Sequence, residues 1–583
     1  MNTDLKTKPH KGTTPKRSGA EAAIEALKAE GVELLFGVTG GAIMPMYDAL
    51  FRDGTLRHII VGHEQGGAHM AEGYARVTGE PGVILTTSGP GATNLVTGLA
   101  DAIMDSTPLV AITGQVATSL IGNDAFQEAD VRGITMPVTK HNYLIQRADE
   151  LPRIFAEGFH IARTGRPGPV LIDLPKDVSN TQTAAPRPER VQLEGYDPPY
   201  QGHPHQIQRA LQALQQAHKP VILAGGGVLH AEACGELREF AEALNLPVVS
   251  TLMGLGNFPT DHALSLGMPG MHGTGYAILS LYHCDVMICV GTRLDDRITG
   301  KLDEFAPWAK LIHIDIDASE IGKNVPALVP VVGHAKPVLQ ELIGGIKRWE
   351  SKPDWSAWHK QLAAWRKEHP LGYEQKADTI MPQMVVQEVD ALLDDDDIIS
   401  TGVGQHQMWT AQYYTFRKPR TWLTSGGLGT MGYGFPAAIG AKLAKPHQRV
   451  VCIDGDGSFL MTIQELATAV RYRVPVVVAV LNNLYLGMVR QWQELFYERR
   501  YAETGLTPPP YDKVAQAFGA LGRRVERPEQ VRPALQWALQ QAEASQLPVV
   551  LDILVDAQEC VYPMVPAGQA NFKFIAGPKG GKR

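Results

Sequence analysis

Apolar and polar positions alternate along the chain in patterns that predict helices and buried strands in turn. Ser18 and Glu21 have the spacing of a capping box, and the apolar positions after them recur at helical intervals up to Gly31. Apolar runs that predict short buried strands follow at residues 32–38, 82–87, 109–113 and 170–174. Strands that alternate with helices predict parallel sheets covered by helices on both faces.

The same alternation returns twice more, so the pattern divides the chain into three α/β units. Further strands are predicted at 221–224, 247–250, 286–290, 311–316, 398–400, 450–453 and 476–481. The stretch 181–204, rich in Pro, Gln and Gly, predicts a linker, whereas the tryptophans and charges of 351–378 predict a helical crossover packed on a domain. We expect a disordered basic tail at 1–17, doubly wound parallel-sheet domains at 18–185, 205–350 and 378–556, and a C-terminal extension at 557–583 over the site.

Length and charge narrow the class of protein. The 583 residues suffice for three or four domains of about 150 residues each. A hydrophobic share of 44% and a charged share of 20% exclude a disordered, collagenous or fibrous protein. Lys and Arg number 54 against 61 Asp and Glu, and the net charge of −7 provides no global attraction for nucleic acid. We therefore expect a small-molecule ligand.

The cysteines and the apolar runs indicate a cytoplasmic protein that does not cross a membrane. None of the five cysteines belongs to a C-x2-C pair, so we expect reduced thiols. The longest apolar run, 474–481, is far shorter than the ~20 residues that a membrane span needs. The basic tail lacks the apolar core of a secretory signal, and disorder is favoured over a short organelle-targeting segment.

Two predicted strand ends in the third unit carry residues suited to a phosphate and a metal ion. Residues 454–458 read DGDGS after one strand, and Asn482-Asn483 follow the next. Ligands bind beyond the carboxyl ends of parallel strands, where these two ends meet. Gly455 and Gly457 would let the backbone approach a phosphate, and the oxygens of Asp456 and Asn483 suit Mg2+. The acidic run 394–397 is interpreted as a solvated turn, with a metal site as the alternative.

Glu64 is the candidate proton carrier of the first unit. It lies in the run His63-Glu64-Gln65-Gly66, between a strand-like segment and a helix. A lone glutamate at a helix start is usually only a partner for the helix dipole. Here its neighbours are apolar or glycine, which would desolvate the carboxyl group and let it hold and exchange a proton.

Further motifs share one resemblance. They are GGAIMP (40–45), HEQGGAHMAEGYAR (63–76), TSGPGATN (87–94), ITGQV (112–116), DAFQE (124–128), GRPGPVLIDLPKDV (165–178), GVGQHQMW (402–409), GLGTMGYG (427–434) and GMVRQWQELF (487–496). Together with the paired GDG and NN motifs, they resemble the acetolactate (acetohydroxyacid) synthase family of thiamine diphosphate-dependent enzymes. The resemblance runs from about residue 20 to about residue 570.

The resemblance implies an architecture and a set of cofactors. The first domain would bind the aminopyrimidine ring, the second FAD, and the third the diphosphate with Mg2+. The catalytic large subunit would form a homodimer or homotetramer with each active site between the first domain of one subunit and the third of another, so Glu64 and Asp456 would meet only in the oligomer. A small regulatory subunit is a possible further partner.

The resemblance also assigns residues to each ligand. For thiamine diphosphate they are Gly404, Gln405, His406, Gly429, Met431, Gly455, Gly457, Ser458, Gly487 and Met488, and for Mg2+ they are Asp456, Asn483 and the main-chain oxygen of Tyr485. For FAD they are Arg166, Gly225, Gly226, His272, Gly273, Thr274, Arg293 and Asp315. One position departs from the family, since His334 follows Gly333 where an acidic residue is usual, at the adenine end of FAD.

Catalytic and substrate-handling roles are implied in the same way. Glu64 would activate the cofactor, and Phe126, Gln127, Lys176, Arg297 and Trp492 would act on the substrates, with Met271 and Val403 in the substrate pocket. Arg297 would hold a keto-acid carboxylate, for which a guanidinium is suited. Trp492 would favour an acceptor with an ethyl over a methyl side chain, at about 1 kcal/mol for the extra methylene.

The activity implied is the decarboxylation of pyruvate and transfer of the hydroxyethyl unit to a second keto acid. Pyruvate as acceptor gives 2-acetolactate and 2-ketobutyrate gives 2-aceto-2-hydroxybutyrate, at the entry to valine, leucine and isoleucine synthesis. A catabolic flavin-free acetolactate synthase, a pyruvate oxidase and a non-catalytic paralogue are the alternatives. The intact Glu64, Asp456 and Asn483 oppose the last, and Glu64 also argues against a glyoxylate carboligase.

Overall fold

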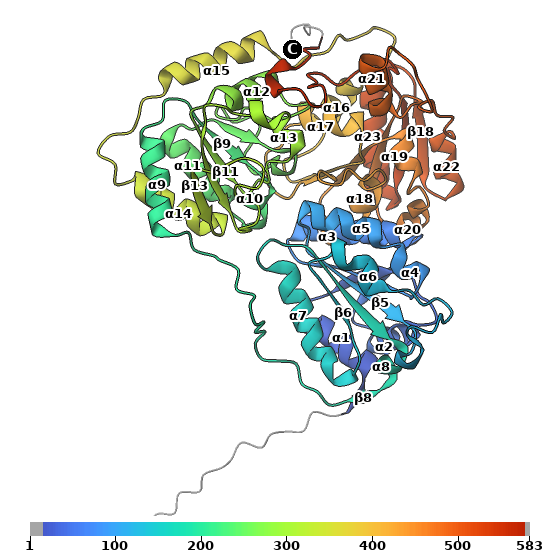
Figure 1. Ribbon diagram of the computed structural model, residues 1–583. Coiled ribbons are helices and arrows are strands. Elements are labelled where there is room, and N and C mark those ends of the chain that lie inside the picture. Colours follow the sequence, from blue (N-terminus) through green and yellow to red (C-terminus); the bar gives the residue numbers. More distant parts are fainter. Residues whose placement is uncertain (1–15, 578–583) are drawn as a thin grey trace, which may run out of the picture.

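Three α/β domains make up the computed structural model, which describes residues 16–577 (Figure 1). Every strand pair within the three large sheets is parallel, which confirms the predicted fold class. The tail predicted at 1–17 lies outside the described residues up to residue 15. Arg17 was wrongly included in that tail. It pairs with Thr183 in a small antiparallel ribbon, and its guanidinium donates to Ala185 O at 3.2 Å.

The first domain contains a six-stranded sheet in the order β3-β2-β4-β5-β7-β6. Its strands are β2 (Leu34–Gly37), β3 (Arg57–Ile60), β4 (Gly82–Thr86), β5 (Leu109–Gln115), β6 (His141–Leu144) and β7 (Pro169–Pro175), with the ribbon β1 (Arg17–Ser18) and β8 (Gln182–Thr183). Its helices are α1 (Gly19–Ala29), α2 (Met44–Asp53), α3 (Glu64–Thr78), α4 (Pro90–Thr93), α5 (Val96–Asp105), α6 (Val131–Thr135), α7 (Leu151–Arg163) and α8 (Lys176–Asn180). Strands β4, β5 and β7 are buried along their whole length, because helices cover both faces.

Local sequence fixes the start of this domain as predicted. The Ser18 hydroxyl accepts from Glu21 N at 3.2 Å, and the Glu21 carboxylate accepts from Ser18 N at 2.8 Å. This capping box satisfies backbone donors that the first turn of α1 leaves free. The chain leaves the helix through Gly31, whose φ of +80° is readily adopted only by glycine.

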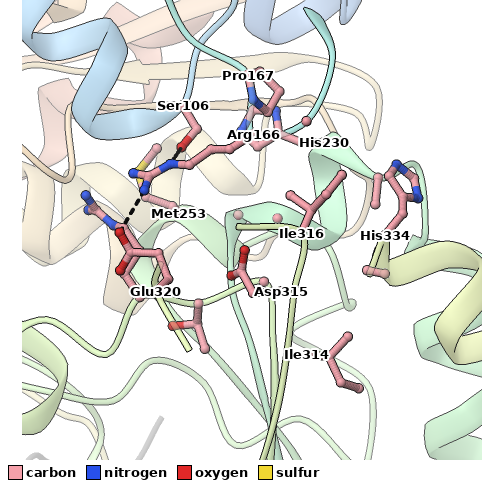
Figure 2. A pocket seen from close by; sticks show the side chains of 18 of the residues that line it. Ser106, Arg166, Pro167, His230, Met253, Ile314, Asp315, Ile316, Glu320 and His334 are labelled. Carbon is pink, nitrogen blue, oxygen red and sulfur yellow. Dashed lines mark hydrogen bonds and ion pairs between the residues drawn. The ribbon is translucent and has the colours of Figure 1, made fainter. Parts of the chain in front are cut away.

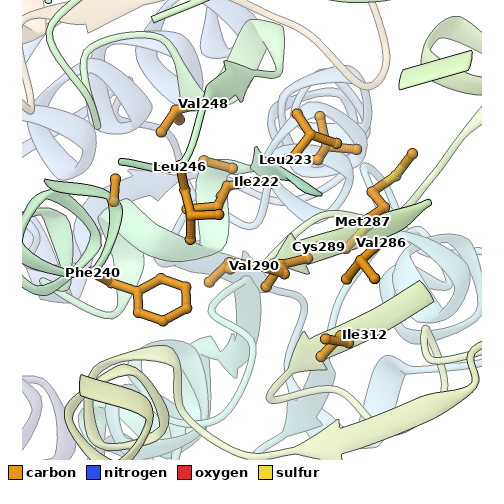
Figure 3. Packing of buried hydrophobic residues seen from close by; sticks show 14 of the residues in the cluster. Ile222, Leu223, Phe240, Leu246, Val248, Val286, Met287, Cys289, Val290 and Ile312 are labelled. Atoms are coloured by element: carbon orange, nitrogen blue, oxygen red, sulfur yellow. The ribbon is translucent and has the colours of Figure 1, made fainter. Parts of the chain in front are cut away.

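The middle domain contains a five-stranded sheet in the order β10-β9-β11-β12-β13. Its strands are β9 (Pro220–Ala224), β10 (Val248–Ser250), β11 (Val286–Val290), β12 (Lys310–Asp315) and β13 (Val329–Val332). Its helices are α9 (Pro204–Gln215), α10 (Gly226–His230), α11 (Cys234–Leu244), α12 (Gly275–His283), α13 (Asp296–Thr299) and α14 (Ala335–Ile346). Figure 3 shows its core, where Phe240 of α11 lies beside apolar side chains of the sheet.

The segment after the middle domain is a packed helix, as predicted. Helix α15 (Ser356–Glu368) lies against this domain, and Trp355 and Trp358 are both buried. Their indole N–H groups donate to Ala217 O at 2.8 Å and to Pro220 O at 3.1 Å. The two hydrogen bonds anchor the crossover at the start of strand β9.

The third domain contains a six-stranded sheet in the order β15-β14-β16-β17-β19-β18. Its strands are β14 (Ile398–Thr401), β15 (Trp422–Leu423), β16 (Val450–Gly455), β17 (Val477–Asn482), β18 (Leu521–Val525) and β19 (Val549–Leu554). Its helices are α16 (Pro382–Asp390), α17 (Gln405–Tyr413), α18 (Gly434–Ala444), α19 (Asp456–Leu460), α20 (Glu465–Arg471), α21 (Gly487–Phe496), α22 (Tyr511–Ala517) and α23 (Pro528–Ser545). The acidic run at 394–397 forms ion pairs with Arg417, Lys418 and Arg449, which favours the turn interpretation over a metal site.

Helices α3 and α18 cross so closely that the first and third domains share one core (Figure 1). A Cβ atom at Gly73 of α3 would lie 2.1 Å from Ala437 O, and one at Gly440 of α18 would lie 1.9 Å from Met70 O. Neither glycine can therefore carry a side chain without moving a backbone. This contact fixes the third domain against the helix that begins with Glu64.

The C-terminal segment lies over the middle and third domains. Val561 and Met564 are buried, Val565 N donates to Met271 O at 2.8 Å, and Gln412 Nε2 donates to Tyr562 O at 3.1 Å. The five cysteines are free thiols. Within residues 16–577, no helix has the length and apolar character required to cross a membrane.

Candidate active site

The carboxyl ends of β14, β16 and β17 surround one cavity in the third domain. It is lined by Val403, Gly404, Gln405, His406, Trp409, Met431, Gly455, Asp456, Gly457, Ser458, Leu481, Asn483, Tyr485, Leu486, Gly487, Met488 and Val489. Every third-domain residue assigned to the cofactor or the metal is in this set except Gly429. The two motifs at the strand ends therefore do meet at one site, as the parallel topology predicted.

Gly429 is the exception, and its place in the loop explains why. Its backbone N–H donates to Ser425 Oγ at 3.0 Å, and its φ of +74° turns the chain before Met431. Gly429 thus shapes the loop that presents Met431, and it does not line the cavity itself.

Asp456 has the surroundings of a cation ligand. Its Oδ2 atom is buried and has no hydrogen-bond partner, while its main-chain oxygen accepts from the Tyr511 hydroxyl at 2.6 Å. Burial raises the pKa of Asp456 to about 7. An orphaned, desolvated carboxylate oxygen is costly unless a proton or a cation binds it. Asn483 and Tyr485 line the same cavity, so the donor set fits a hard cation such as Mg2+.

Glycines keep the cavity open where a diphosphate would lie. A Cβ atom at Gly487 would lie 2.1 Å from Gln405 Oε1, and one at Gly455 would lie 2.7 Å from the His406 ring. Burial lowers the pKa of His406 to about 3, so the ring is neutral without a ligand. Backbone and polar side chains thus form walls that a phosphate can contact directly.

A hydrogen-bond chain links this cavity to the C-terminal segment. Asn483 Nδ2 donates to Gln405 Oε1 at 3.1 Å, and Gln405 Nε2 donates to Gln491 Oε1 at 3.0 Å. Gln491, which is fully buried, accepts from Val561 N at 2.8 Å and donates to Val561 O at 2.9 Å. The position of the segment is therefore coupled to the candidate metal ligand Asn483.

Glu64 lies at the start of α3, apart from this cavity. Its Oε2 accepts from Asn94 Nδ2 at 2.9 Å, and His63 caps the helix. The turn before it is held by Glu465 of α20, which accepts from Gly62 N and His63 N, each at 3.0 Å. Glu64 does not line the Asp456 cavity. Within one chain, then, Glu64 and Asp456 do not line the same cavity.

The other first-domain candidates divide between two places. Gln127 lies beside Gly89, where a Cβ atom would approach Gln127 O to 2.8 Å, and Gly91 of the same turn faces Glu64. Phe126 projects into solvent with 88% of its surface exposed. Lys176 begins α8 and is exposed as well. Gln127 and Glu64, both half-buried, therefore border the same turn of the first domain, and Phe126 precedes Gln127 in the chain.

The remaining substrate candidates lie on the middle and third domains. Arg297 is exposed, and its Nη1 lies 3.8 Å from Met271 Sδ. Trp492 on α21 packs edge-on against Phe496, and its indole N–H is buried without a partner. The structure thus brings Met271 and Arg297 together but does not join them to Glu64 within a single chain.

A second pocket lies between the first and middle domains (Figure 2). Its walls enclose about 990 Å3, which includes space open to solvent. Arg166 reaches in from the first domain, where its Nε donates to Ser106 Oγ and its Nη1 to Glu320 Oε1, both at 2.9 Å. Burial raises the pKa of Asp315 on the opposite wall to about 6. Gly226, Arg293 and His334 also line it, so the pocket fits a large ligand such as FAD.

Four residues assigned to FAD do not line this pocket: Gly225, His272, Gly273 and Thr274. Gly225 N donates to Val290 O within the sheet, and Thr274 caps α12 through its hydroxyl. His272 O accepts from Gln412 Nε2 at 2.8 Å, at the contact with the third domain. These residues support the pocket wall and the interdomain contact, and sequence position alone could not separate such roles from direct lining.

Several residues in or near the candidate sites are not singled out by the sequence analysis. Gln491 and Asn94 lie inside recognised motifs, where their types could have been noticed. His230, Met253 and Thr292 line the middle-domain pocket from isolated positions. Only folding brings them together, so no spacing rule could find them.

Comparisons with known proteins agree with this geometry. Three family models match in order: the N-terminal TPP binding domain of thiamine pyrophosphate enzymes at 17–134, their central domain at 207–342, and their C-terminal TPP binding domain at 402–553. The acetolactate synthase of Mycobacterium bovis is 51% identical over 568 residues, which cover 96% of this chain and 91% of that protein. The probable acetolactate synthase large subunit of Methanocaldococcus jannaschii is 50% identical over 94% of each chain.

A third relative extends the comparison. The acetolactate synthase isozyme 3 large subunit of Escherichia coli is 47% identical over 553 residues, 94% of this chain and 96% of that protein. Identity at this level over nearly the full length shows common descent and a common fold. The chain belongs to the acetolactate synthase family of thiamine pyrophosphate enzymes.

Proposed function

We propose that the protein is an acetolactate synthase that joins two 2-keto acids with loss of carbon dioxide from pyruvate. The observation that carries the proposal is the buried, unpartnered Asp456 Oδ2 beside Asn483 in a glycine-walled cavity. When bound there, thiamine diphosphate would supply a carbon nucleophile that adds to the keto carbon of pyruvate and takes up the electrons released with carbon dioxide. The acceptor would be a second pyruvate or 2-ketobutyrate.

Residues of the third domain would hold the metal and the diphosphate. Asp456, Asn483 and the main-chain oxygen of Tyr485 would bind Mg2+, because all three are oxygen donors at one cavity. Gln405 and His406 would contact the phosphate oxygens. Met431 would support the cofactor from the side of the 425–430 loop.

FAD would occupy the pocket between the first and middle domains. Arg166, Arg293 and the glycines at the start of α10 would contact its phosphates, and His334 would lie at one end. The family resemblance gives FAD a structural role in this reaction. Protein purified with FAD should therefore be yellow and consume no oxygen during catalysis.

A second copy of the chain would complete each active site. Glu64 and Gln127 are half-buried and Phe126 is exposed on the first domain, and the Asp456 cavity lies on the third domain of the same chain without them. In a homodimer or tetramer, Glu64 of one subunit would hold and return a proton at the aminopyrimidine ring bound by the other. Arg297 would bind a keto-acid carboxylate, and Trp492 would shape the acceptor pocket.

Mixing two inactive variants tests the shared site. Glu64→Gln and Asp456→Ala should each abolish acetolactate formation, because each removes one half of every site. Mixed dimers would then contain one site with both substitutions and one with neither, so activity should return on mixing. Continued inactivity of proven mixed dimers would contradict a site built from two subunits.

Product analysis tests the activity itself. With thiamine diphosphate, Mg2+, FAD and pyruvate, we expect 2-acetolactate and no oxygen uptake, and omission of thiamine diphosphate or Mg2+ should abolish the product. Oxygen uptake with acetyl phosphate or acetate as product would instead indicate a pyruvate oxidase. Full activity without FAD would indicate the catabolic type of acetolactate synthase.

Two further features complete the proposal. The name "large subunit" of the relatives supports a small regulatory subunit as a partner, which co-purification would test. The functional domains would span 18–185, 205–350 and 378–556, and the protein would act in the cytoplasm.

A further inference from the structure

A group of buried charged side chains lies between α3, α5 and the start of α18, and of its members only Asp105 also lines one of the two pockets described above. Glu72 and Arg76 come from α3, Asp101 and Asp105 from α5, and Tyr433 precedes α18. All five are nearly or fully excluded from solvent. Three carboxyl groups face one guanidinium, so the group carries more negative than positive charge if all are ionised. Buried excess charge of this kind must be relieved by a proton or a cation.

Two of these carboxyl groups hold the loop 425–430 that leads to Met431. Asp101 Oδ1 accepts hydrogen bonds from the Ser425 hydroxyl and, at 2.8 Å, from the Thr430 hydroxyl. The Asp105 carboxylate accepts from the backbone N–H groups of residues 426 and 427, at 2.9 and 2.7 Å. The first domain thus clamps a third-domain loop that presents Met431 to the cofactor cavity.

Glu72 and Asp101 each retain one oxygen without a partner. Glu72 Oε2 and Asp101 Oδ2 are both buried and make no hydrogen bond. Ligand atoms of His69, Glu72 and Asp101 all lie within 4.8 Å of one another. Burial, together with the charges of Asp101 and Asp105, raises the pKa of Glu72 well above its ordinary value. A single proton on Glu72 would convert the two orphaned acceptors into one hydrogen bond.

The contact of Glu72 with His69, through its other carboxylate oxygen, is consistent with a protonated Glu72. His69 Nδ1 lies 2.9 Å from Glu72 Oε1, and burial lowers the pKa of His69, so the ring is neutral. A neutral His69 with its proton on Nδ1 donates to Glu72 Oε1, and its Nε2 faces Gln65 Nε2 at 3.5 Å. The donors then run in one direction, from Gln65 through His69 and Glu72 to Asp101.

The remaining charged and titratable groups around Glu72 are Arg76, Asp105 and Tyr433. Arg76 Nη1 donates to Thr424 O at 2.8 Å and lies 3.7 Å from Asp105 Oδ2, so its charge is directed at Asp105. Burial raises the pKa of Tyr433 well above its ordinary value, so this phenol is neutral. No second cation among the described residues of this group compensates Glu72 and Asp101.

We propose that Glu72 carries a proton at neutral pH and donates it in a hydrogen bond to Asp101, and that this pair positions the 425–430 loop and thereby Met431. Glu72 and Asp101 are positioning residues, since they act on the cofactor cavity through the loop. The part that concerns Met431 rests on the proposed function. The protonated state of Glu72 does not, so the two can fail separately.

The Glu72→Gln and Glu72→Met variants test the hydrogen bond. In Glu72→Gln the new side-chain amide can donate to Asp101 as the protonated carboxyl does, whereas the thioether of Glu72→Met leaves Asp101 Oδ2 without a donor. We expect Glu72→Gln to bind thiamine diphosphate with Mg2+ within about twofold of wild type and Glu72→Met to bind at least about tenfold more weakly. Circular dichroism confirms folding of each variant, and Glu33→Gln, at an exposed position of the first domain, is the matched control.

Two measurements without cofactor test the proton directly. The infrared spectrum of wild type at pH 7 should contain one protonated-carboxyl band more than that of Glu72→Gln. A raised folded-state pKa means that folding retains a proton that the unfolded chain loses, so wild-type stability falls as pH rises above the ordinary glutamate value, about tenfold in the folding equilibrium per pH unit. Glu72→Gln lacks this dependence, so its thermal midpoint should rise relative to wild type from pH 5 to pH 7.

Each of the following results would contradict one part of the proposal. If the infrared band is absent, Glu72 is ionised and the proposal is wrong. The same conclusion follows if the difference in thermal midpoint between wild type and Glu72→Gln is independent of pH while Glu33→Gln behaves as wild type. Metal analysis that finds one tightly bound divalent ion, lost in Glu72→Gln, would replace the proton with a cation. If both Glu72 variants keep full cofactor affinity while the band is present, the pair does not position the loop. If wild type itself fails to bind thiamine diphosphate, the proposed function fails and the infrared result still judges the proton.

Discussion

Gln491 offers the sharpest test of how the C-terminal segment is held over the cofactor cavity. Its fully buried side-chain amide forms hydrogen bonds with both the N–H and the C=O of Val561, and it accepts a hydrogen bond from Gln405 Nε2. In Gln491→Leu the two Val561 groups lose these partners inside the protein. A buried polar group left unsatisfied costs about 1–3 kcal/mol, so docking of the segment should weaken by at least about 2 kcal/mol, or about 30-fold.

Limited proteolysis measures this docking. Chymotrypsin can cut the segment after Phe572 and Phe574 only when it leaves the surface, and we expect cleavage of Gln491→Leu to be at least about tenfold faster than that of wild type. Affinity for thiamine diphosphate should fall too, because Gln405 and Asn483 lose their support. Gln516→Leu, which removes one exposed hydrogen bond to Gly522 O, is the control. Unchanged cleavage and affinity in Gln491→Leu would refute the coupling.

The remaining predictions concern the cavity and the acceptor pocket. Binding of Mg2+ with thiamine diphosphate should release protons, because the cation displaces the proton that Asp456 holds below its pKa of about 7. The number of protons released should increase as pH falls from 8 to 6. Calorimetry in two buffers measures this number, and an equal release in Asp456→Asn would refute the prediction. Gly487→Ala should fold but bind the cofactor at least about tenfold more weakly, because the new methyl would lie 2.1 Å from Gln405 Oε1; wild-type affinity by fluorescence titration would contradict the cavity geometry. Trp492→Leu should reduce the preference for 2-ketobutyrate over pyruvate by about fivefold, which corresponds to about 1 kcal/mol for one buried methylene, and an unchanged product ratio would exclude Trp492 from the acceptor pocket.

Much of the fold could be predicted from local pattern. The strand at 286–290 and the capping box at Ser18 are found as expected, because periodic apolar residues and a cap are determined by neighbours in the sequence. The motif pair at Asp456 and Asn483 was also predicted to converge, since parallel topology brings successive strand ends to one edge.

Other features depend on contacts between segments far apart in the chain. Arg17 continues a run of basic residues in the sequence, yet pairing with Thr183 orders it. Ser458 lies in a short helix that ends at Leu460, and a second helix starts at Glu465. The Glu465 carboxylate accepts a hydrogen bond from the turn before Glu64. No periodicity reports such a tertiary hydrogen bond.

The predicted FAD residues show the same limit. Gly226 and Arg166 line the pocket, whereas Gly225 and Thr274 pair and cap within the domain. A motif identifies the region of the fold that forms a site. Which of its side chains faces the ligand depends on the backbone direction at each residue, and neighbouring residues can point to opposite sides. Glu72 lies inside a recognised motif and Asp101 inside helix α5, but only the folded structure shows that each has a buried oxygen without a hydrogen-bond partner.

The most direct test of the central claim is product analysis with pyruvate and 2-ketobutyrate in competition. The purified protein with thiamine diphosphate, Mg2+ and FAD should form 2-acetolactate and 2-aceto-2-hydroxybutyrate with one carbon dioxide released per product, identified by nuclear magnetic resonance. Asp456→Ala should form neither. Release of carbon dioxide with acetaldehyde or acetate as the product, and no carbon–carbon bond formed, would contradict the assignment as an acetolactate synthase.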